Sequence, residues 1–182
     1  MEPAADNLVW IDLEMTGLEP ERCFIMEIGT LITNSQLELV AEGPDFVVHN
    51  DEAQLASLSE WCKDHFGRTG FIEKVKESRT SAREAELQTL AFIKQHVLPG
   101  TAPLFGNSVH NDRAFLYQHM RELHDFLHYR NIDVSTVKEV VERWYPGKAS
   151  PPPKADLHRA MTDIRESVLE LRYYREHFFI KP

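Results

Sequence analysis

Two carboxylates, Asp12 and Glu14, lie inside an apolar segment near the start of the chain. Segment 8–15 reads Leu-Val-Trp-Ile-Asp-Leu-Glu-Met, and its apolar residues do not alternate with polar ones. This pattern is typical of a strand that is buried on both faces in the middle of a sheet. Residues i and i+2 of a strand point to the same face, about 7 Å apart. The two acids are therefore expected to be neighbours.

Burying two like charges side by side is unfavourable unless a positive charge joins them. A divalent cation would neutralise the pair, and oxygen ligands suit Mg²⁺ or Mn²⁺. The alternative is that the strand ends early and both acids are solvated, but the apolar residues on either side argue against it. The sequence therefore predicts a metal site to which the rest of the chain delivers further ligands.

Three more residues are candidates for this site, although each has an ordinary structural explanation. Asp112 follows a short apolar segment at the start of an expected helix, where the helix dipole favours any acid. Asp163 precedes Ile164 on an amphipathic helix and could be a solvated acid. His158 is one of nine histidines and could be a surface residue. Five helical residues would separate His158 from Asp163 by about 140°, so His158 must lie at or before the helix start to share a site.

The expected secondary structure positions these residues in an α/β domain. After the first strand, the expected strands cover 27–33, 37–48, 103–106 and 132–134. The expected helices cover 54–66, 71–78, 81–97, 111–123, 135–144 and about 157–178. Ser81 and Ser135 are expected to cap their helices, and Leu87 belongs to a core stripe at helical spacing. Three strands followed by alternating helices and strands predict a single domain, 1–182, with a mixed sheet flanked by helices.

Composition limits the partners that this chain can have. A chain of 182 residues that is 42% hydrophobic suits one globular domain with a core. No segment approaches the ~20 apolar residues of a membrane span, so no membrane partner is expected. With only two cysteines, a disulfide framework is not expected, and a cytoplasmic protein fits best, although an organellar form stays open.

The net charge of −9 constrains a nucleic-acid substrate. Proteins that follow long nucleic acids usually carry a basic stripe that displaces phosphate counterions. This acidic chain should repel a long polyanion over most of its surface. A nucleic-acid substrate is therefore expected to be short and gripped locally, with bound metal ions supplying positive charge, and no long duplex partner is expected.

Three motifs, in order along the chain, resemble those of the DEDDh family of 3′→5′ exonucleases. Segment 10–18 resembles the first motif, 106–108 with Asp112 the second, and the His-x4-Asp spacing of 158–163 the third. Further segments resemble the members of that family that degrade very short RNAs, at 41–44, 61–63, 128–130, 133–136 and 173–175. The resemblance implies an RNase H-like fold with a five-stranded mixed sheet, a homodimer, and release of nucleoside 5′-monophosphates from single-stranded RNAs of roughly two to five nucleotides.

The resemblance also implies roles for the acids and the histidine. It implies two divalent cations, Mg²⁺ or Mn²⁺, with Asp12 bridging both ions. Glu14 and Asp163 would hold the ion that carries the attacking water, and Asp112 would support the second ion. His158 would take the proton from that water, a role that suits an imidazole titrating near neutrality.

Residues that would contact the substrate follow from the same resemblance. Leu18 and Trp61 would grip the 3′ base, with Trp61 stacking on it. The residues implied around the 5′ phosphate are Ser108, Arg130, Ser135, Thr136 and Tyr129 of the partner subunit. The alternatives are that Trp61 belongs to the core, that Ser135 only caps its helix, and that Arg130 is a surface charge.

The chain departs from the family pattern at two positions. Thr162 stands where many relatives carry Asp, and Phe66 stands where relatives often carry His, with His65 beside it. A substrate contact from position 66 is therefore in doubt.

Two other functions compete with this interpretation. The chain could be a proofreading or general DNA exonuclease, although its charge and length disfavour a long strand. It could also be a binding module that kept the fold and lost the chemistry, but all five catalytic-type residues are present.

Overall fold

A five-stranded mixed sheet forms the centre of the computed structural model, which describes residues 3–155 and 158–180. The strands are β1 (Leu8–Met15), β2 (Ile25–Thr33), β3 (Leu39–Val47), β4 (Leu104–Gly106) and β5 (Asn131–Asp133). Their order is β3-β2-β1-β4-β5, with β1, β2 and β3 antiparallel and β4 and β5 added in parallel. The expected α/β class and mixed sheet are confirmed, and β1 is the central strand.

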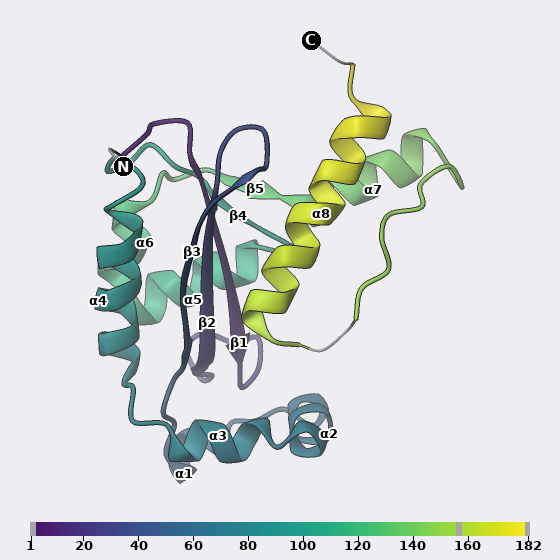
Figure 1. Cartoon of the computed structure of the whole chain (residues 1–182). Coiled ribbons are helices and arrows are strands. Elements are labelled where there is room, and N and C mark those ends of the chain that lie inside the picture. Colours follow the sequence, from purple (N-terminus) through teal and green to yellow (C-terminus); the bar gives the residue numbers. More distant parts are fainter. Residues whose placement is uncertain (1–2, 156–157, 181–182) are drawn as a thin grey trace.

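Helices cover both faces of this sheet and one of its ends (Figure 1). They are α1 (Glu52–Leu55), α2 (Glu60–Thr69), α3 (Phe71–Glu77), α4 (Ala82–Ile93), α5 (His110–His119), α6 (Arg121–Phe126), α7 (Val134–Trp144) and α8 (Ala160–Phe178). The expected start of the last helix, Leu157, lies outside the described residues. Across residues 3–155 and 158–180, no helix has both the length and the apolarity to cross a membrane.

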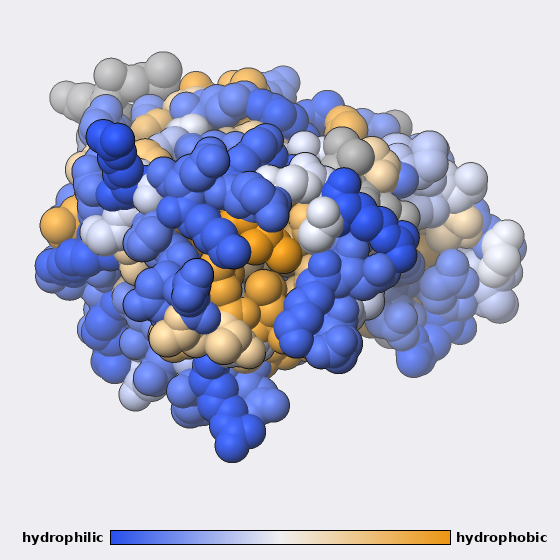
Figure 2. Space-filling view, turned by 90° about the horizontal axis from the view of Figure 1, so that it is seen from below, coloured by the Kyte–Doolittle hydropathy of each residue, from blue (hydrophilic) through white to orange (hydrophobic). Residues whose placement is uncertain are grey.

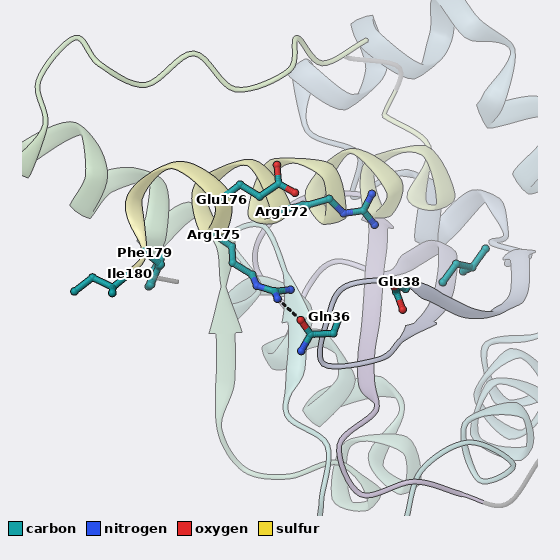
Figure 3. Close-up of a pocket in the computed structure, with 8 residues that line it drawn as sticks. Gln36, Glu38, Arg172, Arg175, Glu176, Phe179 and Ile180 are labelled. Atoms are coloured by element: carbon teal, nitrogen blue, oxygen red, sulfur yellow. Dashed lines mark hydrogen bonds between the residues drawn. The ribbon is translucent and has the colours of Figure 1, made fainter. Parts of the chain in front are cut away.

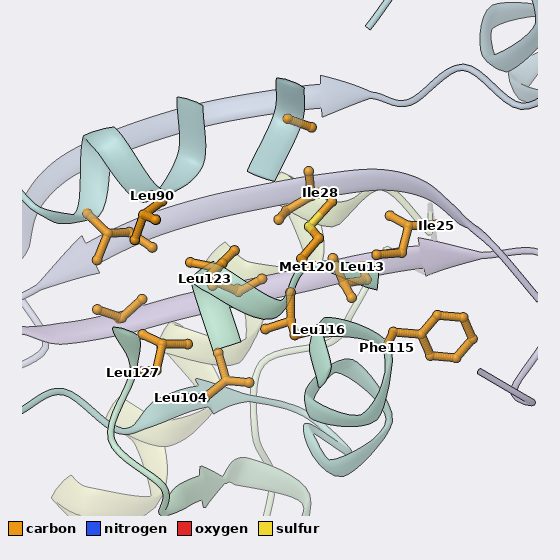
Figure 4. Packing of buried hydrophobic residues seen from close by; sticks show 14 of the residues in the cluster. Leu13, Ile25, Ile28, Leu90, Leu104, Phe115, Leu116, Met120, Leu123 and Leu127 are labelled. Atoms are coloured by element: carbon orange, nitrogen blue, oxygen red, sulfur yellow. The ribbon is translucent and has the colours of Figure 1, made fainter. Parts of the chain in front are cut away.

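The side chains of β1 divide between two cores. Val9, Ile11 and Leu13 belong to the cluster formed with α4, α5 and α6, and Figure 4 shows Leu13 beside Leu116 in that cluster. Trp10 belongs to the cluster on the other face, formed with α7 and α8. Because strand side chains alternate between faces, Asp12 and Glu14 share the face of Trp10, on the side of α8.

Two expected helices are each split in the structure. The helix expected at 54–66 is α1 followed by α2, because Ser59 accepts the N–H of Cys62 and begins a new helix. The helix expected at 111–123 breaks at Met120, whose backbone is not helical. The new N-terminus after Met120 is satisfied from another element: buried Glu86 of α4 accepts the N–H groups of residues 122 and 123.

Two expectations about single helix residues are wrong. Asp133, rather than Ser135, caps α7, because its carboxylate accepts the N–H of Ser135 at 2.9 Å. This arrangement leaves the Ser135 hydroxyl available for other contacts. Leu87 is 43% exposed, whereas its helix buries Leu90 and Ile93.

Candidate active site

Glu14, His158 and Asp163 come together where the start of α8 crosses β1. One possible ligand atom from each lies within 4.8 Å of the other two. Helix α8 begins at Ala160, so His158 precedes the helix while Asp163 lies in its first turn. This position agrees with the expectation that His158 lies at or before the helix start if the two residues share a site. Its backbone is left-handed, with φ of 45°, which is uncommon for a residue other than glycine.

Asp112 approaches the same part of β1 from helix α5. It is buried in the first turn of α5, and its Oδ1 accepts the main-chain N–H of Leu13 at 2.9 Å. Leu13 lies between Asp12 and Glu14 on β1. The hydrogen bond therefore ties the start of α5 to the strand that carries the first two acids, and it brings Asp112 close to Asp12.

Burial and mutual repulsion make these carboxylates hard to ionise without a cation. Burial first, and then neighbouring Asp112, Glu14 and Asp163, raise the pKa of Asp12 well above its ordinary value. Burial and nearby acids raise the pKa of Glu14 to about 9, although the guanidinium of Arg159 acts in the opposite direction. Burial also raises the pKa of Asp112 to about 8, against the effect of its hydrogen bond from Leu13.

The donor set fits a divalent metal ion. Glu14 and Asp163 supply two carboxylates and His158 an imidazole within 4.8 Å of one another, and Asp12 and Asp112 are close enough to act electrostatically on these acids. Oxygen ligands favour Mg²⁺ or Mn²⁺, whereas Zn²⁺ usually takes more nitrogen or sulfur ligands. A cation would also remove the repulsion that raises the pKa values of these acids.

We expect the stabilisation by Mg²⁺ to increase with pH. Between about pH 4.5 and pH 9 the folded metal-free protein holds more protons on Glu14 than the unfolded chain, so its stability falls as the pH rises. Metal binding requires deprotonated ligands and therefore tightens over the same window. The rise in Tm that Mg²⁺ causes should be larger at about pH 8.5 than at about pH 6.5. Thermal unfolding at both pH values measures it; an equal or larger rise at the lower pH would contradict these pKa values.

A cavity of about 420 Å³ opens beside Glu14, and Leu18 and Trp61 line it together. Leu18 is 68% exposed and Trp61 is 56% exposed, so the alternative that Trp61 belongs to the core is wrong. The face of Trp61 stacks on His65, whose ring meets His158 edge-on at 4.3 Å between centroids. Figure 2, seen from the side of α1–α3, shows an apolar hollow within a largely hydrophilic surface.

A second polar cluster joins the end of β4 to the start of α7. The main-chain N–H of Ser108 donates to Asp133 Oδ1 at 2.9 Å, and the hydroxyls of Ser108 and Ser135 lie 3.3 Å apart. Thr136 is exposed in the next position of α7. Arg130 and Tyr129 precede β5; both are exposed, and the guanidinium lies 5.4 Å from the centre of the Tyr129 ring.

Sequence reasoning missed the polar network behind this cluster. Asn107 accepts a hydrogen bond from the Ser135 hydroxyl and donates to Ser167 of α8 at 2.6 Å. Buried Glu170, one turn further along α8, binds Lys154 at 2.7 Å. The available signal was Glu170 itself, an acid within the buried stripe of an amphipathic helix.

A larger cavity lies elsewhere among the described residues. It has about 910 Å³ and separates α8 from the turn between β2 and β3, where Arg175 bonds Gln36 (Figure 3). Its lining contains exposed charged residues and none of the residues predicted for the site. The candidate active site is therefore defined by the converging acids, not by the size of its cavity.

Known proteins resemble this chain along nearly its whole length. The RNase_T family model, described as exonuclease, matches residues 9–171. The chain is 51% identical over 174 residues to an oligoribonuclease of Marinobacter nauticus, covering 96% of this chain and 97% of the relative. It is 48% identical over 179 residues to an oligoribonuclease of Shewanella oneidensis, covering 98% and 99%.

Solved structures share the fold at low sequence identity. The zinc-bound complex of Escherichia coli exonuclease I with single-stranded DNA has a TM-score of 0.74 at 13% identity, covering 98% of this chain and 41% of that chain. Exonuclease I of Methylocaldum szegediense has a TM-score of 0.68 at 15% identity, covering 94% and 41%. The chain thus spans about two fifths of the length of these exonucleases, and the likeness confirms the RNase H-like fold.

Proposed function

Because the chain belongs to the RNase_T exonuclease family, and within it to the oligoribonucleases, we propose that it degrades very short RNAs from the 3′ end. It is a nuclease, a hydrolase of phosphodiester bonds. The proposed substrates are single-stranded oligoribonucleotides, above all diribonucleotides, and the products are nucleoside 5′-monophosphates. The observation that supports this most directly is the convergence of Glu14, His158 and Asp163 at the start of α8.

Two divalent cations, Mg²⁺ or Mn²⁺, are proposed as cofactors. Asp12, Glu14, Asp112 and Asp163 would hold them. When bound, the cations would stabilise the negative charge that develops on the attacking and leaving oxygens. The raised pKa values of Asp12, Glu14 and Asp112 support this assignment, because acids that repel one another are those that a cation would neutralise.

His158 is proposed as the general base. Its imidazole would accept a proton from water while the water oxygen bonds to phosphorus and the bond to the 3′ oxygen of the preceding nucleotide breaks. The leaving 3′ oxygen would gain a proton from solvent. Contacts with His65 and Trp61 support this role, because they hold the ring of His158 beside the carboxylates.

Leu18 and Trp61 are proposed to grip the 3′ base. Both are exposed beside Glu14, at the cavity that adjoins the acids. Stacking on an indole is worth roughly 1–3 kcal/mol per base and accepts every base. His65 covers one face of the Trp61 ring, so a base would stack on the other face.

Ser108, Arg130, Ser135 and Thr136 are proposed to hold the 5′ phosphate. The hydroxyl contact between Ser108 and Ser135 supports a shared anion site at the start of α7. These four residues, called here the phosphate cap, would close the substrate-binding groove after two nucleotides. The net charge of −9 supports the same preference for short substrates, because long strands would be repelled.

A homodimer is proposed to complete this cap, with Tyr129 of the partner subunit reaching the substrate. Tyr129 is 76% exposed. Trp144 and the residues at the end of α8, Phe179 and Ile180, also expose apolar surface. Contiguous exposed apolar surface often marks an interface between proteins.

Product analysis on oligomers of graded length tests this function. RNAs with a 5′ phosphate should yield nucleoside 5′-monophosphates from the 3′ end in the presence of Mg²⁺ or Mn²⁺, with the diribonucleotide cleaved fastest. Faster cleavage of long single-stranded DNA would favour the general DNA exonuclease instead. Binding of a diribonucleotide without any hydrolysis would favour the binding module.

We expect Arg130→Ala to damage cleavage of the shortest substrates selectively. Losing charge-assisted hydrogen bonds to a phosphate should lower kcat/KM for a 5′-phosphorylated dinucleotide by about 10- to 100-fold. Oligomers that extend past the cap should lose much less. Arg143→Ala, which removes another exposed arginine paired on the surface of α7, is the control. If kcat/KM falls equally for the dinucleotide and for longer oligomers, Arg130 does not belong to a 5′-phosphate site that limits substrate length.

A further inference from the structure

A fully buried carboxylate, Glu27, lies directly beneath the candidate active site. It pairs with Glu14 in the antiparallel register of β1 and β2, and its side chain is 0% exposed. Its two oxygens accept hydrogen bonds from the Nε–H of Arg159, at 2.9 and 3.1 Å, and Oε1 also accepts one from a terminal nitrogen of the same guanidinium. Sequence analysis did not single out either residue.

The same carboxylate caps helix α8 from a neighbouring strand. The main-chain N–H of Ala160, the first residue of α8, donates to Glu27 Oε2 at 3.0 Å. Arg159 occupies the N-cap position of α8 and makes no side-chain cap of its own. The first N–H groups of a helix have no partner within the helix, and Glu27 supplies one for Ala160.

Two residues further along β2, Gly29 lets the start of α8 lie close to the sheet. A Cβ atom at position 29 would lie 3.0 Å from the main-chain nitrogen of Met161 and 3.1 Å from the carbonyl carbon of Ala160. Glu27 and Gly29 share a face of β2 because they are two residues apart. The helix start is thus held by an ion pair, a cap and a close backbone approach.

Two residues of the candidate active site flank Arg159, the arginine that pairs with Glu27, along the chain. His158 directly precedes Arg159, and Asp163 lies one turn after it, with its N–H bonded to the carbonyl of Arg159 at 3.0 Å. His158 has a left-handed backbone, a conformation that persists only where the surroundings hold it. The guanidinium of Arg159 also lies over the ring of Phe71, at 5.1 Å.

We propose that Glu27 and Arg159 are positioning residues, which hold His158 and Asp163 against Glu14 in the geometry that hydrolysis requires. This inference rests on the proposed function. Glu27 is fully buried and the Arg159 side chain is 34% exposed, and an ion pair with a buried partner contributes little net stability compared with well-packed apolar residues. Its place at the junction of β2 and α8 instead determines where the two site residues stand.

The test compares Arg159→Gln with Arg165→Gln. Arg165 is the matched control, because it also joins α8 to the sheet, through a 2.6 Å ion pair with Glu42 of β3 that is about half exposed. We expect Arg159→Gln to lower kcat on a diribonucleotide by about 10²-fold, because misplacement of about 1 Å has effects of that size. Its KM should change less than about threefold, since the groups proposed to bind the substrate stay in place. Arg165→Gln should change neither value.

Two further variants separate positioning from folding. Arg159→Lys keeps a charge within reach of Glu27 and should recover part of kcat. The double variant Glu27→Gln with Arg159→Gln should lose no more activity than Arg159→Gln alone, because both changes break one interaction. All rates are measured below the Tm of each variant and expressed per folded molecule.

The outcomes are distinguishable. Normal kcat for folded Arg159→Gln, or a lowered Tm with normal kcat, would overturn the positioning role and leave the proposed function intact. Wild-type protein that hydrolyses no diribonucleotide with Mg²⁺ or Mn²⁺ would overturn the proposed function and this inference together.

Discussion

Asp12→Ala is expected to lower kcat by at least about 10³-fold, because it removes a carboxylate proposed to hold the cations. Charge stabilisation by the cations is worth several kcal/mol, and each 1.36 kcal/mol is a factor of ten in rate. Removal of metal by EDTA should abolish the activity of the wild-type protein in the same way. Hydrolysis of a diribonucleotide at saturating Mg²⁺ measures both effects.

The stability of Asp12→Ala separates a metal site from a structural acid. In metal-free protein, Asp12 lies among acids that raise its pKa, so removing it should relieve repulsion and leave the Tm unchanged or higher near neutral pH. The rise in Tm caused by Mg²⁺ should shrink or vanish. Asp125→Ala, which removes an exposed acid paired with Arg121, serves as the control and should retain full activity. Undiminished turnover by Asp12→Ala would refute the two-cation assignment.

His158→Ala is expected to lower kcat by about 10²- to 10⁴-fold, the usual contribution of a general base. KM should change little, since Leu18 and Trp61 keep their places beside the acids. The acid limb of the pH–rate profile should change with the substitution, because it reports an essential base. His49→Ala is the control, since His49 is an exposed histidine outside the site.

Metal binding by His158→Ala decides between two roles for the imidazole. A ring nitrogen of His158 lies within 4.8 Å of ligand atoms of Glu14 and Asp163, so it is placed to bind the same metal ion as they do. A general base leaves the Mg²⁺-induced rise in Tm intact when it is removed, whereas a ligand weakens that rise. An unchanged rate would instead return His158 to an ordinary surface role.

The sequence by itself determined the central strand and the order of the elements. An unbroken apolar run with two acids predicted a buried central β1, and the structure confirms it. The five-residue spacing between His158 and Asp163 predicted that, if both serve one site, the histidine lies at or before the helix start, because the helical period excludes a shared face. These features are local: they depend on chain geometry over fewer than about ten residues.

Tertiary structure alone decided how distant segments complete the site. Glu27 and Arg159 are 132 residues apart, and neither local pattern indicates that one would cap the helix of the other. Asp133 rather than Ser135 caps α7, and the Ser135 hydroxyl instead donates to Asn107, 28 residues away. Trp61 could be core or surface from its sequence, and only the packing of α2 left it exposed. Periodicity and spacing specify which face of an element is apolar; which partner satisfies a buried polar group depends on segments that meet only in the folded chain.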